Sequence, residues 1–224
     1  MKIKIAHLYY NLLNLYGEQG NVLALKKALI KQDAKVEVDL LTIGDKIDFK
    51  KYDIFYFGSG SNENLLLVLD DIKKYTKEIE KAIKKGKYFI ATGNAYELFG
   101  EYIKMNNQKY ETLGIFKYHA EESPKRIVGE NFLQFEDLSP IIGFNNHSCN
   151  VTDITNPLFK VLGNNEDEGY HEDNFFGTHL IGPLLIRNPH LTDYIVKDIM
   201  GKKYQPRKVD IEDKAYEEYL KNFY

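Results

Sequence analysis

The sequence contains no tryptophan and a single cysteine, Cys149, among its 224 residues. One cysteine excludes an internal disulfide, so an ordinary apolar core must stabilise the fold, and a reducing cytoplasm is the simplest compartment. No apolar run approaches the roughly 20 residues that cross a membrane as a helix. The opening residues, MKIKI, are typical of a strand and not of a signal peptide. We therefore expect a cytoplasmic protein without a membrane span.

Neither sign of charge dominates the chain. It carries 30 basic and 33 acidic residues, a formal net charge of -3, which gives no general attraction to nucleic acid or to anionic membranes. No cluster of His, Cys, Asp and Glu has the spacing of metal ligands, and the phosphate-binding pattern G-x-x-x-x-G-K-[ST] is absent. The sequence therefore predicts no cofactor, no metal and no nucleic-acid partner.

Apolar runs alternate with glycine-containing turns and helical patterns through the first hundred residues. Hydrophobic residues make up 43% of the chain, enough for a packed core. Strands are predicted at residues 2–9, 35–42, 53–57 and 88–91. A helix capped by Asn21 extends to about Lys31, and a long amphipathic helix through residues 65–83 ends at Gly86. This order predicts parallel strands with helices on both faces.

The second half of the chain changes character. Residues 110–165 hold short β-type runs, such as 126–128 and 141–144, and few helical patterns. One more strand is predicted at 175–180, followed by closing helices at 189–200 and 211–223. No shift in composition marks a boundary, so we expect a single domain over residues 1–224.

Four segments carry motifs in a fixed order, and a fifth is weaker. They are LYGEQGN at 15–21, FGSGSN at 57–62, ATGNAYELFG at 91–100, GTHLIGPLL at 177–185 and, more weakly, GFNNH at 143–147. They resemble L-Y-G-D-x-G-N, F-G-G-G-Q-D, A-I-C-G-G-Y-Q-L-L-G, G-T-Y-L-H-G-P-x-L and G-F-E-N-H of the class I glutamine amidotransferases of the cobyric acid synthase (CobB/CobQ) type. Within that family, the small glutaminase subunit of bacterial lipid II isoglutaminyl synthase is the nearest resemblance. The resemblance spans roughly residues 3–200.

The resemblance implies a three-layer αβα sandwich with a mostly parallel, flavodoxin-like sheet. In active members, a cysteine at the turn between strand and helix attacks the glutamine side-chain amide, and a histidine takes its proton. Backbone N–H groups of the glycine loop and of the residue after the cysteine hold the oxyanion. Active relatives of this size act beside a Mur-ligase-like synthetase that receives the ammonia.

Both catalytic side chains are missing from these motifs. The cysteine position is Gly93 and the histidine position is Ile181. A catalytic cysteine and its histidine act as a unit and together contribute a factor on the order of 10⁶ to the reaction rate. Two neighbouring positions also differ, because Ala95 replaces a family glycine and Glu97 the family glutamine. Glycine relieves the backbone strain of a nucleophile turn, which costs other residues about 1–3 kcal/mol.

Several residues are candidates for a retained ligand site: Arg126, Gly58, Ser59, Gly60 and Asn94. Arg126 falls where the family places an arginine suited to gripping the substrate carboxylate, although an exposed strand arginine explains it equally well. Residues 58–60 form either an anion-binding nest or a tight turn that only serves the fold. Glu18 matches the family's acidic position near the site, and Asn146 and His147 are expected to tie one loop to another.

Displaced catalytic groups are the alternatives. His179 would share a strand face with Ile181 and act as a base, but packing is the preferred interpretation. Cys149 and His147 would form a displaced dyad, against the ordinary interpretation of a small buried cysteine. Thr92 and Ser59 are candidate hydroxyl nucleophiles without an identifiable base.

The sequence thus predicts a catalytically degenerate amidotransferase-like protein. Its role would be that of a non-catalytic subunit beside a Mur-ligase-like synthetase, or of a partner that binds glutamine or a related amino acid. The alternative is an active glutaminase that uses a displaced nucleophile and supplies ammonia for amidation of the cell-wall lipid II or cobyrinate type. A third interpretation is a structural protein without a pocket.

Overall fold

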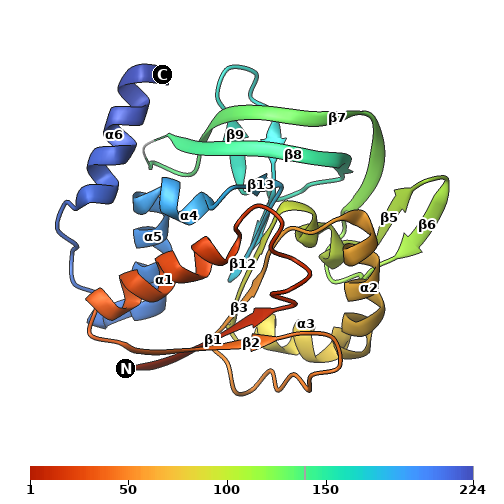
Figure 1. Ribbon diagram of the computed structural model, residues 1–224, viewed down its shortest axis with the longest axis horizontal. Helices are drawn as coiled ribbons and strands as arrows, with labels where there is room; N and C mark the ends of the chain where they lie inside the picture. The colour runs from red at the N-terminus through yellow and green to blue at the C-terminus, as the bar shows by residue number, and fades with distance from the viewer. Residues whose placement is uncertain (139, 224) are drawn as a thin grey trace.

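The computed structural model describes residues 1–138 and 140–223 and contains two sheets (Figure 1). Sheet A has the strand order β11-β12-β4-β3-β1-β2, with all neighbours parallel except β11 and β12. Its strands are β1 (Lys2–Leu8), β2 (Lys35–Leu41), β3 (Ile54–Phe57), β4 (Tyr88–Thr92), β11 (Tyr170–Glu172) and β12 (Phe175–Thr178). The predicted α/β sandwich with a mostly parallel sheet is confirmed.

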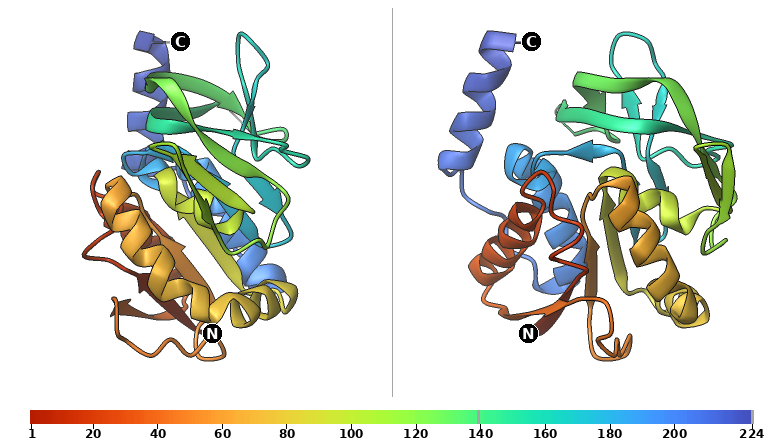
Figure 2. Two further views of the ribbon diagram at one scale, coloured as in Figure 1. Left: turned by 90° about the vertical axis from the view of Figure 1, so that its right-hand side faces the viewer. Right: turned by 45° about the vertical axis from the view of Figure 1, so that its right-hand side comes forward.

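Helices cover both faces of sheet A, as Figures 1 and 2 show. On one side lie α1 (Gln19–Lys31), α4 (Leu184–Arg187) and α5 (Pro189–Met200), and on the other α2 (Asn62–Ile72) and α3 (Thr76–Lys84). The side chains of β3 divide between two apolar cores, with Ile54 and Tyr56 in one and Phe55 and Phe57 in the other. Because both faces are buried, the central strands are continuously apolar.

A second sheet, sheet B, lies over one end of sheet A (Figure 1). Its strand order is β10-β9-β7-β5-β6, with β8 pairing β7 and β13. The strands are β5 (Tyr102–Met105), β6 (Gln108–Glu111), β7 (His119–Gln134), β8 (Ile141–Thr152), β9 (Phe159–Val161), β10 (Asp167–Glu168) and β13 (Leu180–Ile181). The register of β7 against β8 shifts between Glu122 and Ile127, where Pro124 and Arg126 lie. Such a bulge redirects the side chains within it.

The cap predicted at Asn21 was wrong, because α1 already begins at Gln19. Asn21 lies inside the first turn and is fully buried. Its amide bonds to other elements: the Leu185 N–H donates to Oδ1 at 2.8 Å, and Nδ2 donates to the Tyr56 hydroxyl at 2.7 Å. The long helix predicted through residues 65–83 is likewise divided into α2 and α3 by a 3-10 turn, η1 (Lys73–Tyr75).

The strand predicted at 175–180 is divided between the two sheets. β12 ends at Thr178 beside β4, and β13 begins at Leu180 beside β8. His179 lies at this crossover, so the expectation that it shares one strand face with Ile181 was wrong.

The two closing helices were predicted correctly, as α5 and α6 (Ile211–Phe223). α6 stands at the edge of the molecule beside sheet B (Figure 2). In the described parts of the chain, no helix has the length and apolarity to cross a bilayer.

Candidate functional site

The turn after β4 brings the two altered motif positions together. Gly93 opens the short 3-10 helix η2 (Gly93–Phe99) with a φ of 61°, in the left-handed region that favours glycine. A Cβ built on Gly93 would lie 2.3 Å from both Cβ and Oγ of Ser59 and 3.0 Å from Cγ2 of Ile181. Positions 93 and 181 are therefore neighbours, as the motifs imply, and Ser59 fills the space in which a side chain at 93 would begin.

The glycine loop after β3 packs closely against the loop that follows β1. A Cβ on Gly58 would lie 2.2 Å from the Leu13 carbonyl oxygen, and one on Gly60 would lie 2.7 Å from that of Leu12. Both glycines are thus required by close backbone approach. This favours the tight-turn interpretation of the loop.

Asn94, the residue after Gly93, closes onto this loop through its side-chain amide. Its Oδ1 accepts from the Gly60 N–H at 3.1 Å and from the Ser59 hydroxyl at 3.3 Å, and its Nδ2 donates to the Gly60 carbonyl at 2.9 Å. The backbone donor of Gly60 is therefore already occupied within the protein. An anion-binding nest at this residue is not available.

Glu18 is the hub of a buried network beneath the turn. Its carboxylate accepts from the Thr92 hydroxyl, from the Tyr56 hydroxyl at 2.8 Å, from Asn21 Nδ2 at 3.3 Å and from the Gly182 N–H at 3.4 Å. Burial raises the pKa of Glu18, and these hydrogen bonds oppose the rise. Thr92 is fully buried, so its hydroxyl ties elements together and does not face a substrate.

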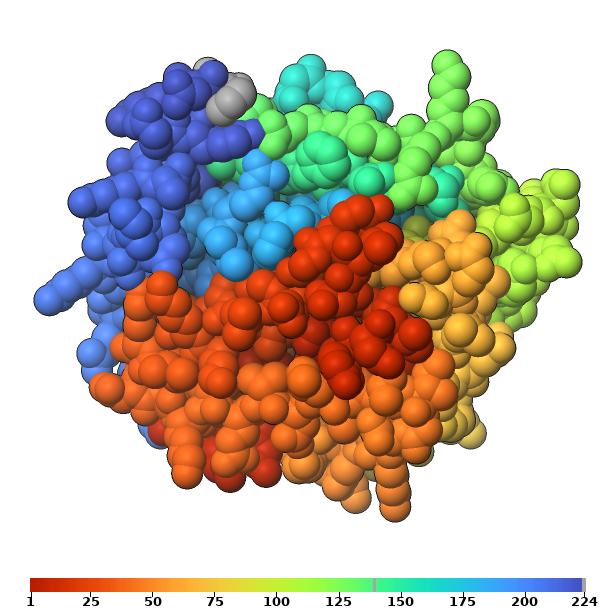
Figure 3. Space-filling model, in the orientation of Figure 1, coloured from red at the N-terminus to blue at the C-terminus, as the bar shows by residue number. Residues whose placement is uncertain are grey.

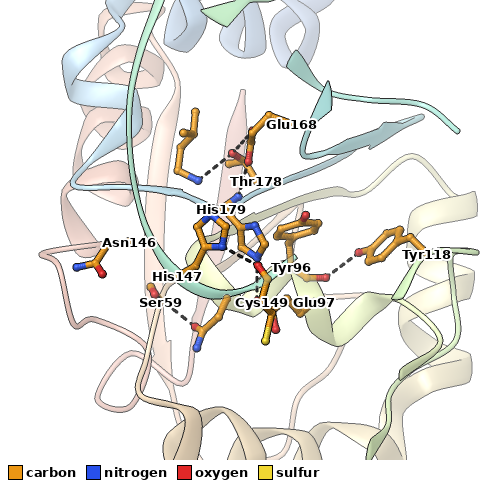
Figure 4. A network of polar contacts seen from close by, with 12 residues as sticks. Ser59, Tyr96, Glu97, Tyr118, Asn146, His147, Cys149, Glu168, Thr178 and His179 are labelled. Carbon is orange, nitrogen blue, oxygen red and sulfur yellow. Dashed lines mark hydrogen bonds and ion pairs between the residues drawn. The ribbon is translucent and has the colours of Figure 1, made fainter. Parts of the chain in front are cut away.

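A second buried cluster joins η2, β8 and the crossover at His179 (Figure 4). Nε2 of His179 lies 2.8 Å from Oε1 of Glu97, and the His147 ring stacks on that of His179 with centroids 3.7 Å apart. Burial raises the pKa of Glu97 to about 8 and lowers the pKa of both histidines to about 3. At neutral pH, a protonated Glu97 therefore donates to an uncharged His179. This supports the packing role preferred for His179.

The displaced dyad of Cys149 and His147 does not have the geometry of an activated thiol. The His147 Nδ1–H donates to the backbone carbonyl of Cys149 at 2.7 Å and not to the sulfur. Burial, and then the neighbouring Glu97 carboxyl, raise the pKa of the Cys149 thiol, whereas reactive thiols have lowered pKa values. Among the described residues, no group of three or more His, Cys, Asp and Glu is arranged to hold a metal.

A polar pocket of about 280 Å³ lies beside the glycine loop. Arg126, in the bulge of β7, reaches it: Nε donates to Asn146 Oδ1 at 2.5 Å and Nη2 donates to the Tyr16 hydroxyl at 3.3 Å. On the face shown in Figure 3, the red segment after β1 meets the golden surface of α2 and the green surface of sheet B. The lining residues are Leu15, Tyr16, Ser59, Gly60, Ser61, Asn62, Glu63, Asn94, Arg126, Asn146, His147 and Ser148.

The structure thus unites four of the five predicted ligand-site residues in one pocket: Arg126, Ser59, Gly60 and Asn94. Gly58 lies behind it, against Leu13 and Glu18. Sequence reasoning missed Tyr16 and Glu63. The Ser61 hydroxyl caps α2 by accepting from the Asn64 N–H, and recognising this cap would have placed the first turn of α2 at the pocket.

Comparisons with known proteins agree with this geometry. The sequence model of the CobB/CobQ-like glutamine amidotransferase domain matches residues 4–189. The Streptococcus pneumoniae protein "Lipid II isoglutaminyl synthase (glutamine-hydrolyzing) subunit GatD" is 34% identical, with 98% of this chain and 87% of that protein covered. The subunit of the same name from Staphylococcus aureus is 30% identical, with 94% and 91% covered.

A solved structure supports the fold. A crystal structure of a glutamine amidotransferase matches with a TM-score of 0.57 at 15% identity, covering 88% of this chain and 98% of that one. The ordered motifs, the parallel sheet and the family match over residues 4–189 lead to one assignment. The chain belongs to the CobB/CobQ-like glutamine amidotransferase family.

Proposed function

We propose that this chain is a non-hydrolysing amidotransferase subunit of the lipid II isoglutaminyl synthase type, which binds an amino acid beside a Mur-ligase-like synthetase. The similarity to two proteins named as subunits of that synthase covers most of each chain. A subunit role is therefore favoured over that of a stand-alone enzyme. Those relatives are named as glutamine-hydrolysing, and three features of this chain oppose the same activity.

The observation that carries the proposal is the filled space at position 93. Ser59 occupies the place where a nucleophile side chain would begin, 2.3 Å from a Cβ built on Gly93. The family motif has glycine at the position of Ser59, which leaves that space open. Side chains in a packed interior shift by an ångström only at a cost in stability. A cysteine at position 93 therefore does not fit unless Ser59 moves.

The position of the base is equally unsuited to chemistry. Ile181 is buried and apolar, and its Cγ2 faces the space at Gly93. Glu18, at the family's acidic position, bonds to Thr92 and Tyr56 instead of orienting an imidazole. The Glu18 carboxylate therefore has a structural role.

The third feature is the occupied donor in the glycine loop. The Gly60 N–H is bonded to Asn94 Oδ1 at 3.1 Å. Removing one oxyanion donor typically costs about 10²–10³ in kcat. A nucleophile placed elsewhere in this pocket would lack that stabilisation too.

The alternative of an active glutaminase with a displaced nucleophile finds little support. Cys149 is buried with a raised pKa, and Thr92 is bonded to Glu18 out of reach of the pocket. Ser59 donates its hydroxyl hydrogen to the amide oxygen of Asn94, which is not a base. The pocket lined by Arg126 argues in turn against a structural protein without a ligand site.

We further propose that residues 1–224 act as one cytoplasmic domain. α6 lies beyond the range matched by the family, yet its start is held to α1 by ion pairs of Lys27 with Glu212, in its first turn, and of Lys31 with Asp210, just before it. A reducing compartment would keep the single thiol free.

Two measurements test the proposal. The purified chain should release no ammonia from glutamine above an enzyme-free blank, and a tagged chain should co-purify with a ligase-like protein from its own cells. A Ser59→Gly/Gly93→Cys/Ile181→His variant should then gain an iodoacetamide-reactive thiol, and Cys149→Ser in the same background removes the native one as a control. Turnover by the unaltered chain at the rate of hydrolysing relatives would overturn the proposal.

A further inference from the structure

We propose that the pocket selects a short polar α-amino acid, of the size of serine or asparagine, and discriminates against glutamine. This inference rests on the proposed function, because it assumes that the pocket binds an amino acid without cleaving it. It is drawn from what forms the floor of the pocket and from the charges on its walls.

Ser59 and Asn94 form the floor. Both line the pocket, whereas Gly93, Ile181 and Thr92 lie buried behind them and do not. The Asn94 amide is fixed by three hydrogen bonds, to the Gly60 N–H, the Gly60 carbonyl and the Ser59 hydroxyl. The pocket therefore ends before the place where the δ-carbonyl of a glutamine would meet a nucleophile.

The walls carry one group of each charge. The Arg126 guanidinium is positioned by Asn146 and Tyr16 on the side of sheet B. Glu63 lies on the first turn of α2, and its own backbone N–H and the Ser61 hydroxyl lower the pKa of its carboxyl. An α-carboxylate at Arg126 and an α-ammonium at Glu63 would each find an opposite charge.

The floor also fits the end of a short polar side chain. Ser59 donates to Asn94, which leaves the lone pairs of its oxygen as acceptors, and Asn94 Nδ2 has a second N–H beyond the one given to Gly60. A hydroxyl or a carboxamide can use both groups. Glutamine is one methylene longer than asparagine, so it would have to displace the bonded pair of Ser59 and Asn94.

Calorimetric titration of the full chain with L-serine, L-asparagine and L-glutamine tests the inference. We expect serine or asparagine to bind at least about tenfold more tightly than glutamine, since one methylene in a fitted pocket changes affinity by roughly 10–200-fold. Arg126→Ala should abolish binding of all three. Val128→Ala is the matched control, because Val128 is exposed two residues further along β7 and does not line the pocket.

A Ser59→Gly/Asn94→Gly variant should bring glutamine to within a few fold of asparagine by opening the floor. If this variant does not fold, the relative affinities of the unaltered chain for asparagine and glutamine still test the inference. Glutamine binding as tightly as asparagine without ammonia release would overturn the inference and leave the proposed function standing. Absence of binding by all three at millimolar concentration would overturn the inference together with the amino-acid-binding part of the proposed function. Ammonia release would instead defeat its non-hydrolysing part.

Discussion

Returning a cysteine to the turn should destabilise the protein, and the reason lies in Ser59. In Gly93→Cys, the backbone at residue 93 keeps a φ near 61°, and the new Cβ lies 2.3 Å from Cβ and Oγ of Ser59. A left-handed backbone costs a non-glycine residue about 1–3 kcal/mol, and overpacking of a buried site costs about 1–3 kcal/mol more. We therefore expect a loss of about 2–6 kcal/mol in the free energy of unfolding.

The two contributions can be separated with matched variants. Gly17 has a φ of 74° and nothing within 4 Å of a built Cβ, so Gly17→Cys reports the backbone cost alone. Ser59→Gly removes the overlap but keeps the backbone cost. The loss caused by Gly93→Cys should therefore shrink by about 1–3 kcal/mol in the Ser59→Gly background, a coupling typical of residues in contact.

Urea unfolding followed by far-ultraviolet circular dichroism is the suitable assay, because the chain has no tryptophan to report by fluorescence. All variants should be measured under reducing conditions to keep the added thiol free. Equal destabilisation by Gly93→Cys with and without Ser59 would refute the reasoning, since it would show that Ser59 does not occupy the space of a side chain at 93.

Two further predictions concern the buried carboxyls. The pKa of Glu97 is raised from 4.5 to about 8 in the folded protein, so its proton favours folding fully below pH 4.5 and this stabilisation is lost as the pH rises through 8. Through this group, the free energy of unfolding should fall by about 1 kcal/mol between pH 7 and 9. Thermal melts across that range should show a smaller fall in stability for Glu97→Gln than for the unaltered chain. An equal fall in both proteins would contradict the raised pKa of Glu97. Glu18→Ala removes the acceptor shared by the buried hydroxyls of Thr92 and Tyr56, which lie 2.6 Å apart, so one can donate to the other and one donor stays unpaired. The substitution should cost about 1–3 kcal/mol in urea unfolding, more than Glu18→Gln. Equal stability of all three proteins would show that the network contributes nothing.

The layout of sheet A could be predicted from the sequence because its strands are buried on both faces. β3 and β4 were placed to within a residue, since continuous apolar runs ended by glycine turns are typical of parallel strands. Sheet B appeared only as short β-type runs. Its longest strand, β7, alternates between half-buried and exposed residues and pairs β8 across a bulge, a long-range pairing that local patterns do not specify.

The details of the site depended on contacts between distant residues. The motifs predicted that positions 93 and 181 would be neighbours, and they are. The bond from Gly60 to Asn94 joins residues 34 positions apart, and the overlap with Ser59 depends on the exact path of two loops. Neither could be inferred from residue types alone. The break at His179 was missed for a similar reason, because only the pairing of β13 with β8 reveals it.

Steady-state release of ammonia from glutamine by the purified chain, alone and mixed with its co-purifying synthetase, tests the central claim most directly. The filled space at Gly93 and the apolar side chain of Ile181 predict a rate equal to that of the blank in both cases. Release proportional to protein concentration, at the rate of hydrolysing relatives, would contradict it, and loss of that release in Cys149→Ser would identify Cys149 as the nucleophile.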